Sequence, residues 1–173
     1  MTTRLPVRKT YKLFVGGAFP RSESGRTLEV EGYNVARASR KDAREAVVSA
    51  RKAVAGWSGA TAYNRGQVLY RLAETMETRT SALAAASSGR REVARAIDRV
   101  VWYAGWADKL AQVLGSSNPV AGPYFNFTLP EPTGVVALVA PDEPALDGLV
   151  ARLAPAVVGG NAVVVIASES HPL

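Results

Sequence analysis

Two short polar segments stand directly after two apolar runs and carry the side chains with the clearest chemistry. Pro141-Asp142-Glu143 follows the run 134–140, and Ala167-Ser168-Glu169 follows the run 161–166. Carboxylates accept hydrogen bonds from hydroxyl groups such as those of a ribose, and a serine hydroxyl both donates and accepts. If the two runs are neighbouring parallel strands, their carboxyl ends open on one edge of the sheet, where ligands of such sheets bind. The two segments are therefore predicted to be neighbours at a ligand-binding rim.

The sequence offers little for covalent or metal chemistry. It contains no cysteine, which removes disulfides, cysteine-ligated zinc and a thiol nucleophile together. Its one histidine, His171, falls in a segment predicted to be flexible, and a serine without an adjacent base is a poor nucleophile. We therefore name no catalytic residue and no metal ligand.

The elements that position the rim follow from the hydrophobic pattern. The continuous β-prone runs 134–140 and 161–166 are typical of strands buried on both faces of a parallel sheet. Between them, Pro144 fits the first turn of a helix and Gly159-Gly160 ends it. This helix has an apolar face made of Leu146, Leu149, Val150, Leu153 and Val157. The segment 134–173 therefore reads as strand, helix, strand: a βαβ unit with a right-handed crossover.

The preceding part of the sequence predicts a hairpin and then helices. The hairpin joins 12–19 to 27–30 through the turn-rich segment 20–25. Ser39 is a candidate N-cap for a helix that runs to about Trp57. A second helix starts at Thr61 and carries an apolar stripe, which predicts a core-facing side, before Ser87-Ser-Gly89 breaks it; the stripe is Val68, Leu69, Leu72, Met76 and Leu83.

A third helix and a strand follow in the pattern. The helix is predicted over 92–114, with Gly115 as a left-handed C-terminal cap and with Trp102 and Trp106 packed in a helix interface. After a loop, Tyr124–Leu129 alternates in the period of a strand with one buried face, formed by Phe125, Phe127 and Leu129.

Composition and charge narrow the class of protein. With 47% hydrophobic and 21% charged residues, the 173 residues are typical of one globular domain. The net charge is +6, but residues 131–173 carry one base and five acids, so the excess of bases lies in the first 130 residues. There, bases and acids alternate along predicted helices, as in 40–45, which is typical of solvated faces and argues against a nucleic-acid partner.

No apolar run reaches the roughly 18 to 20 residues of a membrane span, and the start Met1–Pro6 lacks a signal-peptide core. We therefore expect a cytoplasmic protein without a membrane partner.

Five stretches match one known family in chain order. They are 12–17, 39–47, 57–84, 125–136 and, most specifically, Leu153-Ala-Pro-Ala-Val-Val-Gly-Gly-Asn-Ala-Val-Val-Val165. On these residues the sequence resembles the aldehyde dehydrogenase superfamily, over nearly the whole chain and over roughly the first third of a full-length member. The resemblance implies an α/β fold: the N-terminal portion of the aldehyde-dehydrogenase fold, with helices and an incomplete Rossmann-like parallel sheet.

The resemblance also implies a division of the chain and a cofactor. Residues 1–122 would form the hairpin and helices of the nucleotide-binding domain, 123–133 a strand like that of the family's oligomerisation arm, and 134–173 the first βαβ unit of the sheet. The cofactor would be NAD or NADP. The residues expected to bind it are Val139, Ala140, Pro141, Ser168 and Glu169.

Three positions depart from the family pattern. Asp142 and Glu143 stand where the family usually has Trp and then Asn, whose amide helps to hold the reaction's oxyanion. A carboxylate at Glu143 cannot donate that hydrogen bond and would repel the oxyanion. Ile166 stands where the family usually has the Lys that reaches the adenine ribose. We therefore expect at best weak NAD binding by this chain alone.

Two functions from different classes follow. The resemblance implies NAD(P)-dependent aldehyde oxidation, but this chain lacks the family's cysteine and is expected to be inactive alone: a truncated gene product, a degenerate paralogue (a pseudoenzyme) or half of a split enzyme. The alternative is a non-catalytic structural or regulatory partner that docks on a full-length homologue through the strand 125–129 and the exposed rim of the incomplete sheet. A homo-oligomer or such a homologue is the expected partner. A third hypothesis, a nucleic-acid-binding protein, is supported only by the net charge.

Overall fold

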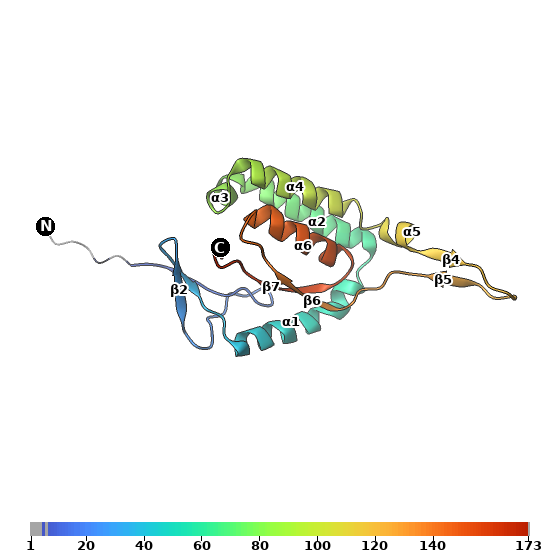
Figure 1. Ribbon diagram of the computed structural model, residues 1–173, viewed down its shortest axis with the longest axis horizontal. Helices are drawn as coiled ribbons and strands as arrows, with labels where there is room; N and C mark the ends of the chain where they lie inside the picture. The colour runs from blue at the N-terminus through green and yellow to red at the C-terminus, as the bar shows by residue number, and fades with distance from the viewer. Residues whose placement is uncertain (1–4, 6, 173) are drawn as a thin grey trace.

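A two-stranded parallel sheet lies between layers of helices (Figure 1). The structure is a computed structural model that describes residues 5 and 7–172; the predicted absence of a signal-peptide core concerns residues that lie mostly outside this part. Strand β6 (Val135–Val139) pairs with β7 (Ala162–Ile166) in the register Val135↔Ala162 to Val139↔Ile166. Helix α6 (Ala145–Val158) covers one face of this pair and α1 (Arg40–Ser58) the other (Figure 1). The predicted βαβ unit is confirmed.

The strands are less buried than their apolar runs predict. None of the ten strand residues is fully buried, and Val139 and Ile166 at the carboxyl ends are exposed. Among the described residues, each strand has one partner, so each keeps one unpaired edge. A continuous apolar run therefore indicates strands that helices cover on both faces, but it does not report whether their edges are covered.

Helix α6 begins and ends close to the predicted positions. Pro144 is its N-cap, with extended backbone, and not a residue of the first turn. Gly159 is the C-cap, and Gly160 follows with φ +89°, a left-handed conformation that glycine adopts without steric cost. The Asn161 side chain then accepts a hydrogen bond from the Gly134 amide at 3.0 Å and donates one to the Ala156 carbonyl at 3.0 Å. It thereby joins the start of β6 to the end of α6.

The N-terminal cap of α1 forms as predicted. The Ser39 hydroxyl accepts from the Asp42 amide at 3.2 Å, and the Asp42 carboxylate accepts from the Ser39 amide at 2.7 Å, which is a capping box. The backbone amides of Glu23 and Ser39 lower the pKa of Asp42 to about 2, because they stabilise its charged form.

The predicted hairpin partner was wrong. Strand β2 (Thr27–Val30) pairs antiparallel with β3 (Tyr33–Ala36), and β1 (Thr10–Tyr11) pairs parallel with β3. The segment 12–19 instead makes a tight turn closed by a bridge between Val15 and Ala18. The hairpin turn is Glu31-Gly32, where both residues have positive φ, as a type I′ hairpin turn requires.

The second predicted helix is interrupted, and two of the five residues of its stripe do not face the core. Helix α2 (Ala62–Thr78) ends before α3 (Thr80–Ala85). Val68 and Leu72 are exposed, whereas the buried face is made of Gly66, Leu69, Ala73 and Met76. The small residues of this face let α4 (Arg90–Ala104) approach closely, and a hydrophobicity pattern gives them too little weight.

The third predicted helix ends ten residues early. Helix α4 stops at Ala104, and a turn leads to the short α5 (Leu110–Leu114). Gly115 has extended backbone and not the predicted left-handed conformation, because the chain passes directly into β4 (Ser116–Asn118). Trp102 is 57% exposed and contacts the Tyr103 ring edge to face and the Trp106 ring at a tilt, so its predicted place in a helix interface was also wrong.

Strand β5 (Asn126–Thr128) pairs antiparallel with β4 in a ribbon that projects from the body of the molecule (Figure 1). The predicted buried face was wrong: Phe125, Phe127 and Leu129 are 77%, 54% and 59% exposed. The alternation is real, but both faces of the ribbon point to solvent.

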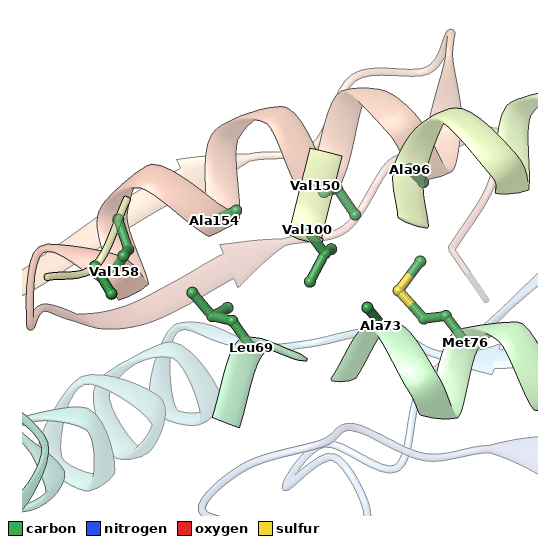
Figure 2. Close-up of a cluster of buried hydrophobic side chains, with 9 residues drawn as sticks. Leu69, Ala73, Met76, Ala96, Val100, Val150, Ala154 and Val158 are labelled. Atoms are coloured by element: carbon green, nitrogen blue, oxygen red, sulfur yellow. The ribbon is translucent and has the colours of Figure 1, made fainter. Parts of the chain in front are cut away.

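The core lies between α2, α4 and α6, as Figure 2 shows. Its side chains point toward one another from the three helices: Leu69, Ala73 and Met76 from α2, Ala96 and Val100 from α4, and Val150, Ala154 and Val158 from α6. Helix α6 thus packs against the sheet on one side and against this core on the other. Within the described ranges, no helix has both the length and the apolar character needed to cross a bilayer.

Candidate functional site

The two predicted rim segments meet at the carboxyl ends of β6 and β7. The Ser168 hydroxyl donates a hydrogen bond to the Asp142 carboxylate at 2.7 Å. The same oxygen accepts from the amides of Ser170 at 3.1 Å and His171 at 2.9 Å. Ser168 is 6% exposed, so one buried hydroxyl ties the end of β6 to the segment after β7. The predicted proximity of the two segments is confirmed.

The rim carries negative charge. The Ser168 hydroxyl, and after it the Ser170 amide, lower the pKa of Asp142, because both stabilise the carboxylate. The exposed side chains of Glu143 and Glu169 belong to the same segments. Carboxylates accept hydrogen bonds from ribose hydroxyls but repel phosphates. The chemistry of this edge therefore suits a sugar and disfavours a pyrophosphate.

The five residues predicted to bind a cofactor occupy two kinds of position. Val139 and Glu169 are exposed at the open edge. The Ala140 amide donates a hydrogen bond to the Ile166 carbonyl at 2.9 Å. Ala140, Pro141 and Ser168 line a cavity of about 150 Å³.

That cavity is too small for a dinucleotide. Its other walls include Leu83, Ser87, Leu149 and His171. Ligand pockets usually measure about 300–1,000 Å³, so a cofactor would have to lie on the open edge and not inside this cavity. Among the described residues, no three His, Asp or Glu side chains are grouped as metal ligands.

A buried glutamate holds the N-terminus of α6, and sequence reasoning missed it. One carboxylate oxygen of Glu92 accepts from the amides of Leu146 at 2.7 Å and Asp147 at 3.0 Å. The other accepts from the Ser88 amide at 2.7 Å. Burial raises the pKa of Glu92, but the hydrogen bonds from Asp147, Ser88 and Leu146 outweigh it and the pKa is lowered.

The same helix end is held by an ion pair. Asp147 lies in the first turn of α6, and its carboxylate accepts a hydrogen bond from the Arg99 guanidinium of α4 at 2.8 Å. The Arg95 guanidinium forms a second ion pair with the same carboxylate at 3.5 Å. The hydrogen bond to Asp147 raises the pKa of Arg99. Next to Asp147, Gly148 lets α6 approach the rim, because a β-carbon at this position would overlap the Pro141 ring.

The C-terminus of α6 is held by side chains from α1 and from the start of α2. The Trp57 indole donates to the Val157 carbonyl at 2.9 Å, and the Arg65 guanidinium donates to the Val158 carbonyl at 3.2 Å. A cation at this end also complements the helix dipole. These contacts join residues 93 and 100 positions apart, and no local sequence signal announces them.

Comparisons with known proteins agree with one another. The model of the aldehyde dehydrogenase family matches residues 27–173. The chain is 31% identical to cytosolic aldehyde dehydrogenase 1 of Elephantulus edwardii, over 99% of the chain and 37% of that protein. It is 34% identical to retinal dehydrogenase 2 of Gallus gallus, over 99% of the chain and 36% of that protein.

Solved structures show the same likeness. The crystal structure of PnpE in complex with nicotinamide adenine dinucleotide matches with a TM-score of 0.87 at 30% identity, over 94% of this chain and 36% of that chain. The chain therefore spans little more than a third of the length of these relatives.

Proposed function

Because this chain belongs to the aldehyde dehydrogenase family, we propose that it forms the part of an NAD(P)-dependent aldehyde-oxidising enzyme that begins the nucleotide-binding sheet. The observation that carries the proposal is the rim at the ends of β6 and β7, where Ser168 and Asp142 are joined by a 2.7 Å hydrogen bond. Parallel sheets bind their ligands at this edge. The NAD held by the similar PnpE structure supports NAD as the cofactor.

In this proposal the rim residues bind and orient the sugar end of the cofactor. The Glu169 carboxylate accepts a hydrogen bond from a ribose hydroxyl. Val139, Ala140 and Pro141 provide an apolar edge against which the sugar and the base pack. When bound, NAD would accept the hydride that is released when the aldehyde is oxidised. The chain has no cysteine to attack an aldehyde, so it provides binding and not the nucleophile.

Nuclear magnetic resonance tests the binding site. Titration of the labelled chain with NAD and with NADP should move the amide signals of Ala140, Ser168 and Glu169, with weak affinity because no lysine stands at position 166. Glu169→Ala should weaken NAD binding by about tenfold or more, since one hydrogen bond to a charged group contributes about 1.5–3 kcal/mol.

The matched control is Glu131→Ala, which removes an exposed acid that precedes β6, at the opposite end of the strand. Glu131→Ala should leave the titration unchanged. Shifts that appear away from the rim, or that survive in Glu169→Ala at full size, would refute the assigned site.

Turnover gives a second test. With NAD and a panel of aldehydes, the purified chain should produce no reduced nicotinamide above the buffer rate, because it holds no thiol nucleophile. Sustained turnover that survives repurification would contradict the proposed division of labour. We also propose a cytoplasmic location, which the cytosolic relative supports.

A second candidate function is a docking partner that binds a full-length homologue or a second copy. The projecting β4–β5 ribbon favours it, because Tyr124, Phe125 and Phe127 are exposed and an apolar hollow of about 330 Å³ lies against the ribbon. Exposed aromatic clusters on unpaired strands favour association.

Size-exclusion chromatography with light scattering tests the docking function. The chain should form a complex with itself or with a full-length relative, and Phe127→Ser should abolish it. Tyr63→Ser, which removes an exposed aromatic residue from α2, is the matched control and should leave the complex intact. A chain that stays monomeric in the presence of the relative would exclude this function.

A further inference from the structure

The N-terminus of α6 is closed by a side chain from another helix. Glu92 is 1% exposed and belongs to the first turn of α4. Both of its carboxylate oxygens are used: one by the amides of Leu146 and Asp147, the other by the amide of Ser88. The first amides of a helix have no partner within the helix and readily hold anions. Here the anion is supplied by the chain itself.

We call the three hydrogen bonds that Glu92 accepts the clamp. The end of α6 that the clamp holds is also the end that meets the rim. The first turn of α6 directly follows the segment Pro141–Pro144, which contains Asp142. A β-carbon added at Gly148 would overlap the Pro141 ring, so the start of α6 lies close against the rim. A shift of this helix end would therefore move Pro141 and Asp142 relative to Ser168. It would also disturb the hydrogen bond between the Ser168 hydroxyl and the Asp142 carboxylate.

We propose that Glu92 is a positioning residue: its carboxylate fills the anion site at the N-terminus of α6 and thereby holds the rim formed by Pro141, Asp142 and Ser168. The importance of this rim for a cofactor rests on the proposed function, whereas the clamp itself does not. A second consequence is that this helix end is not open to the phosphates of a nucleotide, because its amides are already occupied.

Chemical rescue tests the clamp. Glu92→Ala should lower the melting temperature by about 5–15 °C, because buried backbone amides lose their acceptor. Sodium acetate should restore a few degrees in this variant, beyond any effect of sodium chloride at the same ionic strength, since a carboxylate can enter the vacated site. Wild type should not respond to acetate.

Val93→Ala is the matched control. Val93 is the next residue along α4 and is fully buried, so its truncation leaves an apolar cavity beside an intact Glu92. This variant should lose stability without acetate rescue. Equal rescue of Val93→Ala, or no acetate-specific rescue of Glu92→Ala, would overturn the proposal.

Amide hydrogen exchange tests the positioning role. In Glu92→Ala, the amides of Leu146 and Asp147 should exchange at least about tenfold faster than in wild type, the amide of Ala140 should follow, and acetate should reverse both changes. Faster exchange at the helix end with an unchanged rim would refute the positioning role.

Glu92→Gln keeps the test decisive if Glu92→Ala does not fold. The amide side chain keeps one acceptor oxygen for Leu146 and Asp147 but cannot accept from Ser88. We expect faster exchange at Ser88 with retained protection at Leu146 and Asp147; protection of all three amides would overturn the proposal. These measurements contain no cofactor, so they give the same answer whether or not the chain binds NAD.

Discussion

At the scale of single residues, Ser168 determines the state of the rim. Its hydroxyl is buried, donates to Asp142 and accepts from two amides, so it leaves the carboxylate charged and fixed. The sequence predicted that the segments of Ser168 and Asp142 would be neighbours, because strand order determines which segments meet. It could not predict the hydrogen bond, which depends on the side-chain conformation of both residues.

Ser168→Ala should raise the pKa of Asp142 toward its ordinary value, because the hydroxyl is the largest cause of its lowering. In wild type, the lowered pKa of Asp142 stabilises the fold above the pKa of an unfolded aspartate, and this stabilisation is lost as the pH falls through the lowered value. The variant should lose less stability on acidification. Carboxyl-carbon NMR titration measures the pKa, with Asp42 as the internal reference at about 2. An Asp142 pKa that stays at its wild-type value would contradict the assignment of its cause.

At the scale of elements, local patterns predicted what local forces decide. Ser39 as an N-cap residue predicted the start of α1, and Gly159-Gly160 predicted the end of α6. The break between α4 and α5 was missed, because the apolar spacing continues past Gly105, the residue that caps α4. Strand β5 was predicted but given a buried face, because alternation alone does not show which face is covered. Its partner β4 was missed, because residues 116–118 belong to a segment that its composition predicted to be a loop.

Trp57→Phe tests how strongly distant residues hold α6. The substitution keeps the aromatic ring but removes the indole donor from the Val157 carbonyl, so we expect a loss of about 1 kcal/mol and a melting temperature lower by about 2–4 °C. Trp102→Phe is the matched control, because Trp102 is mostly exposed and should cost little. Thermal unfolding followed by circular dichroism measures both. Equal losses in the two variants would show that ring packing, and not the hydrogen bond, holds the helix end.

At the scale of the whole molecule, helix α6 belongs to the three-helix core and also covers the sheet (Figure 2). Small residues let the helices of the core approach one another closely. In the core, Gly66 of α2 lies so close to α4 that an added β-carbon would be 2.9 Å from the Ala104 carbonyl oxygen. The sequence predicted α6 and its strands from apolar runs. It could not predict Glu92, Arg65 and Trp57 as anchors of α6, because they are 54 to 100 residues away from their partners.

Gly66→Ala should therefore destabilise the protein by about 1–3 kcal/mol, because the helices must separate. Gly56→Ala is the matched control on α1, where an added β-carbon meets no atom within 4 Å. That variant should gain about 0.5–1 kcal/mol, since alanine favours a helix more than glycine does. Urea denaturation measures both changes. A stabilised Gly66→Ala would show that α2 and α4 do not pack as closely as described.

The anchors of α6 also set an order of events in time. Trp57, Arg65 and Glu92 all precede α6 in the chain, so on the ribosome they emerge before the helix that they hold. Contacts between residues so far apart in sequence are slow to form, because the chain must first close long loops. We therefore expect α6 to dock after the helices that carry Trp57, Arg65 and Glu92 have formed. Until it docks, Glu92 has no helix end to bind, and the strands on either side of α6 remain exposed to other chains.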